Sequence, residues 1–253
     1  MAVAVCACLW PPEGEETWSA ELDGVWLADA PGLFACFTRL PKLDIRDFAG
    51  FSTSDAEHLF AGRGTLQQVK ERGRYLDGVA TALIDGWDGT AYALIEEARW
   101  HAPKVVDLLV ATVPGYQDRV ETAEGTLAFD KLALLCTAMM ASRSERPLQG
   151  LDDFPVYPDY MLPLVLRHHG VLVYDPELAR AVDSRKEIEP GSNWELAIRW
   201  ATVSAAERLR AVFKELGRDV PAANLDYALW HDAVLGPDAG TMGEHHRTVT
   251  MAY

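Results

Sequence analysis

Apolar residues recur at intervals of three and four along most of the chain, which is the spacing of one face of a helix. Residues 65–84 and 102–113 show this pattern most clearly, and both are predicted to be amphipathic helices. A longer helix is expected over residues 191–216, and a last one over residues 222–236. Helices therefore dominate the predicted fold.

Residues that favour helix ends support further short helices. Residues 159–170 are predicted to form a helix that stops at Gly170, and Asp175 is expected to cap the next helix, with Pro176 in its first turn. Capping boxes, in which a serine precedes a glutamate by three residues, are expected at two other starts. They are Ser54 with Glu57, and Ser192 with Glu195.

Two segments have the character of strands. Residues 24–28 predict a short strand, followed by a helix over residues 32–40, and residues 119–129 alternate around Gly125 as a short hairpin does. That hairpin leads into a helix that Lys131 opens, whose apolar stripe is assigned to the core (Leu132, Leu135, Cys136 and Met139). The sequence therefore predicts a mainly α protein, a compact helical fold with minor β hairpins.

Composition agrees with a folded globular protein. The chain has 253 residues, of which 49% are hydrophobic and 24% charged, enough apolar material for a core. We expect one domain over residues 1–253, with 1–104 and 105–253 as candidate subdomains. No apolar run approaches the roughly 18 to 20 residues of a membrane span, and the first residues lack the basic start of a signal peptide. We therefore expect no membrane association and a cytoplasmic location.

The chain is strongly acidic, with a formal charge of -15. Such a surface repels polyanions, so we expect no direct nucleic-acid partner, although one phosphate can still bind in a local basic pocket. The four cysteines lack CxxC spacing and are expected to be buried free thiols rather than zinc ligands. Adjacent histidines at 168–169 and 245–246 do not have the i,i+4 spacing of a zinc helix. No metal and no cofactor are expected.

Two carboxylates lie among aromatic residues. Asp159 is close in sequence to Tyr157 and Tyr160, and Asp226 lies one helical turn before Trp230. Carboxylates beside aromatic rings are typical of sites that stack a base and bind its edge or its sugar. The alternative is structural: Asp159 caps the following helix, and Asp226 is a charge tolerated near a helix start.

Two basic residues lie among apolar neighbours, Lys131 in AFDKLALL and Arg199 in LAIRWA. Each is either a pocket cation or a surface residue whose stem packs on apolar groups while its charge reaches water. Glu195 is explained by its capping box alone.

Several segments together resemble the queuosine salvage protein family, whose members are queuosine 5'-phosphate N-glycosylase/hydrolases. The resemblance runs from about Cys8 to Tyr253 as one queuosine-salvage domain. The segments that carry it are PGYQD, the Lys131 helix, FPVYPDYMLPLVLRHHGVLVYDPEL, WELAIRWATVSAAERL, LDYALW and the terminal HHRTVTMAY. The family's helical fold is distantly similar to that of helix-hairpin-helix DNA glycosylases.

The resemblance implies roles for individual residues. Asp226 matches the family's catalytic acid and Lys131 a pocket lysine. The matching substrate-binding residues are Tyr157, Asp159 and Tyr160 on the base, Tyr227 and Trp230 on the same aromatic wall, and Arg199 or Lys131 toward the 5'-phosphate. These matches predict a hydrolase that cleaves the N-glycosidic bond of queuosine 5'-monophosphate and releases queuine for tRNA modification.

Two other functions stay open at this point. One is a non-catalytic protein that binds queuine or a related nucleotide. The other is a helix-hairpin-helix DNA glycosylase, although acids and a single glycine occupy the segment that would hold DNA.

Overall fold

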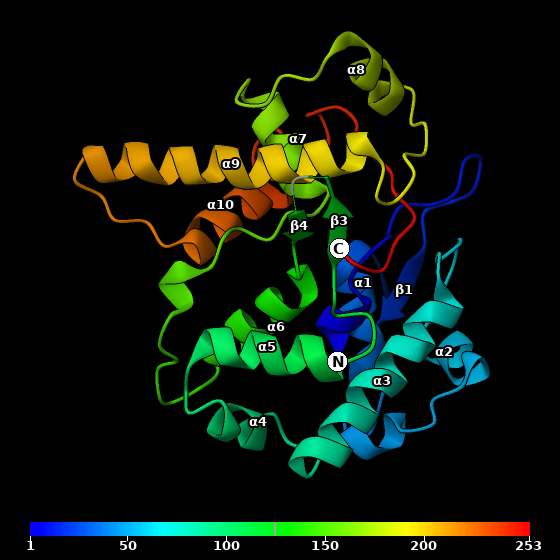
Figure 1. Ribbon diagram of the computed structural model, residues 1–253. Coiled ribbons are helices and arrows are strands. Elements are labelled where there is room, and N and C mark those ends of the chain that lie inside the picture. The colour runs from blue at the N-terminus through cyan, green and yellow to red at the C-terminus, as the bar shows by residue number, and fades with distance from the viewer. Residues whose placement is uncertain (124) are drawn as a thin grey trace. The chain divides into compact units, whose positions relative to one another are not determined.

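The computed structural model describes residues 1–123 and 125–253 (Figure 1). It is mainly helical with two small antiparallel hairpins, as the sequence predicted. The chain divides into two compact units, and each is assembled from separate stretches of sequence. The first unit consists of Met1–Asp118, Leu135–Gln149 and Thr250–Tyr253, and the second of Arg119–Leu134 and Gly150–Val249.

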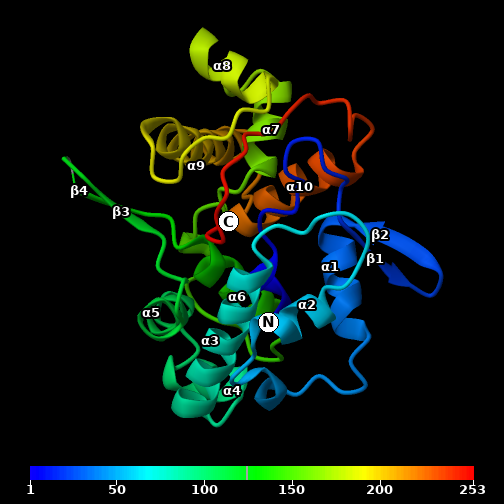
Figure 2. The same ribbon diagram turned by 90° about the vertical axis from the view of Figure 1, so that its right-hand side faces the viewer.

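The first unit contains one hairpin and five helices among its described residues, besides the end of α6. They are β1 (Ser19–Leu22), β2 (Val25–Ala28), α1 (Asp29–Thr38), α2 (Thr53–Leu59), α3 (Val69–Trp87), α4 (Ala91–Glu97) and α5 (Ala102–Thr112). Ser19 pairs with Ala28 in the hairpin, which lies against α1 (Figure 2). The predicted strand and the helices from residues 32, 65 and 102 are thus confirmed, with shifted ends. Strand β1 and helix α4 were not predicted.

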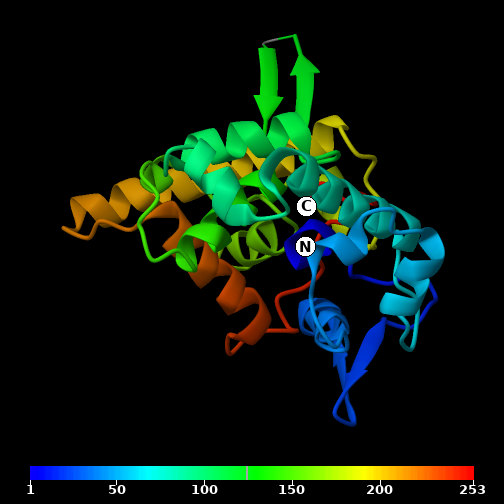
Figure 3. The same cartoon turned by 90° about the horizontal axis from the view of Figure 1, so that it is seen from below.

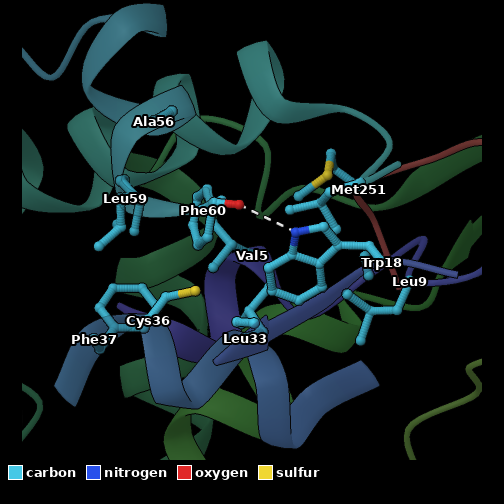
Figure 4. Close-up of a cluster of buried hydrophobic side chains, with 14 of the residues drawn as sticks. Val5, Leu9, Trp18, Leu33, Cys36, Phe37, Ala56, Leu59, Phe60 and Met251 are labelled. Carbon is cyan, nitrogen blue, oxygen red and sulfur yellow. Dashed lines mark hydrogen bonds between the residues drawn. The ribbon is translucent and has the colours of Figure 1, made fainter. Parts of the chain in front are cut away.

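The core of the first unit surrounds a buried tryptophan. Trp18 packs with Leu33 and Met251, and its indole Nε1 donates a hydrogen bond of 3.1 Å to the carbonyl oxygen of Phe60 (Figure 4). This bond satisfies the polar group that burial of an indole would otherwise leave without water. Hydrophobic burial and one internal acceptor thereby tie β1 to the end of α2.

The predicted capping box at Ser54 and Glu57 was wrong by two residues. Ser52 is the N-cap of α2, and it exchanges hydrogen bonds with Asp55, so the box is Ser52 with Asp55. A second start also differs, because Gln68 adopts a left-handed conformation with φ 59° and α3 begins at Val69. Leu66 therefore lies outside the helix to which its spacing assigned it.

The second unit contains the other hairpin and most of the C-terminal helices. Its elements are β3 (Arg119–Thr122), β4 (Gly125–Ala128), the first turn of α6 (Lys131–Ser142), α7 (Met161–His168), α8 (Pro176–Asp183), α9 (Asn193–Glu215) and α10 (Ala222–Leu235). The β3–β4 hairpin appears as two antiparallel arrows in Figure 3. Helix α7 packs against both α9 and α10 (Figure 1). The predicted helices from residues 131, 159, 175, 191 and 222 are all confirmed.

Local hydrogen bonds explain where α8 and α9 begin. The Asp175 carboxylate accepts from the backbone N–H groups of Glu177 and Leu178 and caps α8, with Pro176 as its first residue. Ser192 caps α9 by accepting from the N–H of Glu195. Both N-caps are confirmed. The predicted capping box is formed only in part, because the Glu195 carboxylate accepts from the N–H of Gly191 and the N–H of Ser192 donates to the Glu189 carbonyl.

The four cysteines are free thiols, as expected, but the expectation that all are buried was wrong: Cys8 and Cys36 are buried, whereas Cys6 and Cys136 are half-buried. In the described part of the chain, no helix is both long and apolar enough to cross a membrane. Within the same residues, His, Cys, Asp and Glu side chains form no group of three that could hold a metal ion.

Candidate functional site

A hydrogen bond across the second unit joins α10 to the segment that precedes α7. Asp226 Oδ2 accepts from the backbone N–H of Tyr157 at 2.7 Å. Asp226 is the fifth residue of α10, and its carboxylate bonds a residue outside this helix rather than the N–H groups of the helix start. Packing of α10 on α7 brings this carboxylate to residues 157–159.

The environment of Asp226 favours its protonated form. Burial raises the pKa of this carboxyl, and the negative charge of Asp159 raises it further. The Tyr157 N–H and the positive charge of Lys131 lower the pKa, and the balance brings it to about 7. A carboxyl with a pKa near neutrality can take up and return a proton during a reaction.

Lys131 is the first residue of α6, it is only 4% exposed, and its positive charge acts on the Asp226 carboxyl. That burial rules out the interpretation of a surface residue that reaches water. Its ammonium makes no hydrogen bond or ion pair with any residue that the structure describes. Buried cations are normally paired, so Lys131 presents an available positive charge to an anionic ligand.

Asp159 caps α7, as the structural alternative proposed. Its Oδ1 accepts from the backbone N–H groups of Met161 and Leu162 at 2.8 and 3.1 Å. Its Oδ2 has no hydrogen bond within the described parts of the chain, and the residue is half-buried. Capping therefore leaves one carboxylate oxygen of Asp159 available for a ligand.

The Tyr157 side chain supplies a second available polar group. The residue is 4% exposed, and its buried hydroxyl has no hydrogen-bond partner among the described residues. Burial and the nearby Asp226 charge raise the pKa of this phenol, so it remains a hydrogen-bond donor at neutral pH. A buried donor without a partner costs free energy, which a bound acceptor would recover.

The terminal segment brings two histidines to this group of residues, and their spacing in the sequence argued only against a zinc site. The His245 ring lies on Tyr160, with ring centroids 4.8 Å apart. His246 is buried, and burial together with the charges of His245 and Arg199 lowers its pKa to about 3. His246 is therefore neutral at physiological pH. The HHRTVTMAY match was the signal that could have found both.

Arg199 is buried rather than at the surface, with 2% of the residue exposed. On α9 it pairs with Glu195 at 3.2 Å, donates through Nε to the Pro158 carbonyl at 3.3 Å, and stacks on the Phe129 ring at 4.0 Å. The surface alternative for Arg199 was thus wrong. The capping box does not account for the Glu195 side chain, because its Oε2 accepts from the N–H of Gly191 rather than that of Ser192, and its Oε1 pairs with Arg199.

The two aromatic residues of α10 have different surroundings. Tyr227 is 62% exposed, and its ring is stacked with that of Trp230 at 6.3 Å. Trp230 is half-buried and packs on the apolar cluster that includes Val156 and Leu225. Hydrophobic packing thus accounts for part of the burial of Trp230, and stacking of a base on these rings stays a prediction.

Comparisons with known proteins agree with the sequence motifs. Residues 8–253 match a family model described as queuosine salvage protein. A protein of Sphaerobacter thermophilus named queuosine 5'-phosphate N-glycosylase/hydrolase is 30% identical over 99% of this chain and 79% of its own length. The protein of that name from Dictyostelium discoideum is 30% identical, over 79% of this chain and 63% of its own. The one from Mus musculus is 25% identical, over 64% of this chain and 51% of its own.

Proposed function

The chain belongs to the queuosine salvage protein family, and from that membership we propose that it is an N-glycosyl hydrolase. Its substrate is queuosine 5'-monophosphate, and its base product is queuine, which serves tRNA queuosine modification. The observation that supports this most is the half-buried Asp226 carboxyl, which accepts from the Tyr157 N–H and has a pKa of about 7 under the influence of the Asp159 and Lys131 charges. These are groups that a glycosidase requires close together.

Asp226 acts at the anomeric carbon of the ribose. Cleavage moves the electron pair of the C1'–N bond onto the base nitrogen and leaves positive charge at C1'. Water adds at C1' and loses a proton, and the departing base nitrogen gains one, so that the products are neutral queuine and ribose 5-phosphate. An ionised carboxylate stabilises that charge more than it stabilises the neutral substrate. Direct attack on C1' and activation of water both require Asp226 in its ionised form.

The departing base needs hydrogen-bond donors. A 7-deazaguanine carries carbon where guanine has N7, so protonation at N7 cannot assist its departure. The Tyr157 hydroxyl is a donor without a partner among the described residues, and the available Oδ2 of Asp159 is an acceptor for N–H groups on the base edge. Tyr160 completes this base-binding group, with Tyr227 and Trp230 as an aromatic wall.

Lys131 is assigned to the anionic part of the substrate. Its charge is buried and not paired with a described residue, whereas Arg199 already contacts Glu195. A charge-assisted contact to the 5'-phosphate would be favourable even though the chain as a whole is acidic.

No cofactor enters this reaction, and no nucleic acid is bound directly. The free thiols fit the reducing cytoplasm in which we place the protein.

Release of the base tests the proposal directly. Queuosine 5'-monophosphate is incubated with the protein, and free queuine is measured by chromatography. Turnover is expected for the wild type, and its loss in an Asp226→Asn variant shows that the activity belongs to this site. Binding of queuine without turnover would instead support the non-catalytic alternative, and base release from damaged DNA would support the DNA glycosylase.

Asp159→Asn is expected to move the pH profile of kcat/KM toward lower pH. Asparagine retains an oxygen for the N–H groups of Met161 and Leu162, so the cap of α7 is preserved. Because the Asp159 charge raises the pKa of Asp226, its removal lets Asp226 ionise below pH 7. A midpoint that stays at the wild-type pH, or rises, would contradict this electrostatic coupling.

Trp230→Ala is expected to weaken queuine binding by about 1 to 3 kcal/mol, the usual contribution of an aromatic ring stacked on a base. Leu229→Ala is the matched control, because Leu229 packs on the same apolar cluster from the neighbouring position of α10. Calorimetric titration of both variants with queuine, alongside their melting temperatures, separates stacking from stability. Equal losses of affinity in the two variants would assign Trp230 to packing alone.

A further inference from the structure

The buried guanidinium of Arg199 contacts two segments that lead to the proposed site. One contact is the hydrogen bond from Nε to the Pro158 carbonyl, and the other is the stacking on Phe129. Its ion-pair partner Glu195 lies one turn earlier on α9 and also accepts from the N–H of Gly191. Arg199 thus joins α9 to two stretches of chain that are distant from it in sequence.

The Pro158 contact bears on the position of Asp226. Residues 157–159 are held from two sides, because the Tyr157 N–H donates to Asp226 on α10 while the Pro158 carbonyl accepts from Arg199 on α9. Proline has no N–H and a fixed φ, so this short segment has little freedom to adjust if either bond is lost. The separation of the Asp159 and Asp226 carboxylates depends on both bonds.

The Phe129 contact bears on Lys131. Between them, Asp130 adopts a left-handed conformation with φ 42°, which is unfavourable for a residue with a side chain. An ion pair of 2.8 Å between Asp130 and Arg119 stabilises one side of this turn. The guanidinium face on the buried Phe129 ring stabilises the other. Both contacts fix the first turn of α6, from which Lys131 projects.

We propose that Arg199 is a positioning residue. It fixes the Tyr157–Asp159 segment and the start of α6, so that the Asp226 carboxyl and the Lys131 ammonium are correctly placed to contact the substrate. This inference rests on the proposed glycosidase function. It differs from the phosphate-binding role that the sequence suggested for Arg199, because the guanidinium already donates to Glu195 and Pro158 within the protein. It also differs from a purely structural role in what a substitution does. Apolar residues of similar volume often replace a buried ion pair without loss of stability. Such a replacement would leave the activity unchanged if Arg199 only stabilised the fold, and would reduce it if Arg199 positions the reacting groups.

Two variants test the proposal. Arg199→Lys retains the charge but not the planar group that reaches both Pro158 and Phe129. The double variant Glu195→Gln with Arg199→Met removes both charges while leaving an acceptor for Gly191, so no charge is buried alone. For folded samples of each, kcat and KM are measured on queuosine 5'-monophosphate and on queuosine.

We expect kcat to fall roughly 10- to 100-fold in both variants, as misplacement of reacting groups does, while the preference for nucleotide over nucleoside is unchanged. Arg210→Lys is the matched control, because Arg210 also lies on α9, pairs with Glu207 and donates through Nε to a carbonyl. Its kcat is expected to equal that of the wild type. A loss of kcat/KM on queuosine 5'-monophosphate but not on queuosine would assign Arg199 to the phosphate. A wild-type kcat in the folded double variant would show that Arg199 serves only the stability of the fold.

A readout without turnover separates failure of this inference from failure of the proposed function. The titration of Asp226 is followed by carboxyl carbon NMR in the wild type and in Arg199→Lys. A displaced Tyr157–Asp159 segment is expected to move this midpoint away from its wild-type value, which we expect near pH 7. If the wild type releases no queuine but the midpoint moves in the variant, the glycosidase proposal fails and the positioning role stands. An unchanged midpoint overturns the positioning role.

Discussion

Asp226→Asn is expected to reduce queuine release at least 100-fold, the low end for loss of a positioned catalytic group. Asparagine keeps an oxygen for the Tyr157 N–H, so the link between α10 and residues 157–159 survives while the charge that stabilises C1' is lost. The rate is measured by chromatography on queuosine 5'-monophosphate, and queuine affinity by titration. Wild-type turnover in this variant would remove Asp226 from the mechanism.

The free energy of unfolding of the same variant is expected to depend on pH differently from that of the wild type. The pKa of Asp226 is about 7 in the folded protein and near 4 when the chain is unfolded, so ionisation opposes folding as the pH rises through this window. Asp226→Asn should therefore be more stable than the wild type at pH 8, by on the order of 1 to 4 kcal/mol, and equally stable near pH 4. Denaturant unfolding at both pH values checks that lost activity does not reflect lost folding.

Lys131→Met is expected to lower kcat/KM on queuosine 5'-monophosphate by roughly 1.5 to 3 kcal/mol, the range for a hydrogen bond to a charged group. The loss on queuosine, which has no phosphate, should be smaller, so the preference for the nucleotide narrows. Parallel kinetics on the two substrates measure this difference. Equal losses of kcat/KM on the two substrates would place Lys131 at the base or at C1'. No loss on either substrate would show that Lys131 has only a structural role.

The pH profile of this variant provides an independent control. Because the Lys131 charge lowers the pKa of Asp226, its removal should move the rise of kcat/KM to higher pH, opposite to the effect of Asp159→Asn. Lys131→Arg keeps the positive charge and should leave the midpoint close to that of the wild type. Shifts of the same sign in Lys131→Met and Asp159→Asn would contradict the arrangement of charges around Asp226.

Local signals predicted helix positions well where a short side chain caps the first turn. Asp175 and Ser192 are such cases, because their partners lie within three residues and spacing alone identifies them. The same rule failed at Ser54, because Ser52 has an acid three residues later as well, and spacing does not choose between two overlapping boxes. The left-handed Gln68, which delays α3, has no signature in hydrophobic periodicity.

The surroundings of the candidate site depend on long-range contacts that the hydrophobic periodicity of the sequence does not predict. Lys131 and Arg199 could be surface or buried residues on local grounds, and only the folded chain shows Phe129 and Glu195 around Arg199. Family motifs identified Asp226 without predicting its bond to the Tyr157 N–H. Sequence therefore indicated which residues to consider, while their charges and partners come from the tertiary structure.

The bond between Asp226 and Tyr157 also constrains the order in which the second unit can mature. It spans 69 residues, and the bond between Arg199 and Pro158 spans 41. During synthesis, residues 157–159 leave the ribosome long before α10, and closing such loops costs entropy that only the completed packing recovers. The environment that brings the pKa of Asp226 near neutrality cannot exist in a nascent chain that lacks α10. The proposed catalytic carboxyl thus acquires its raised pKa only after α10 has been synthesised and has packed against the segment that precedes α7.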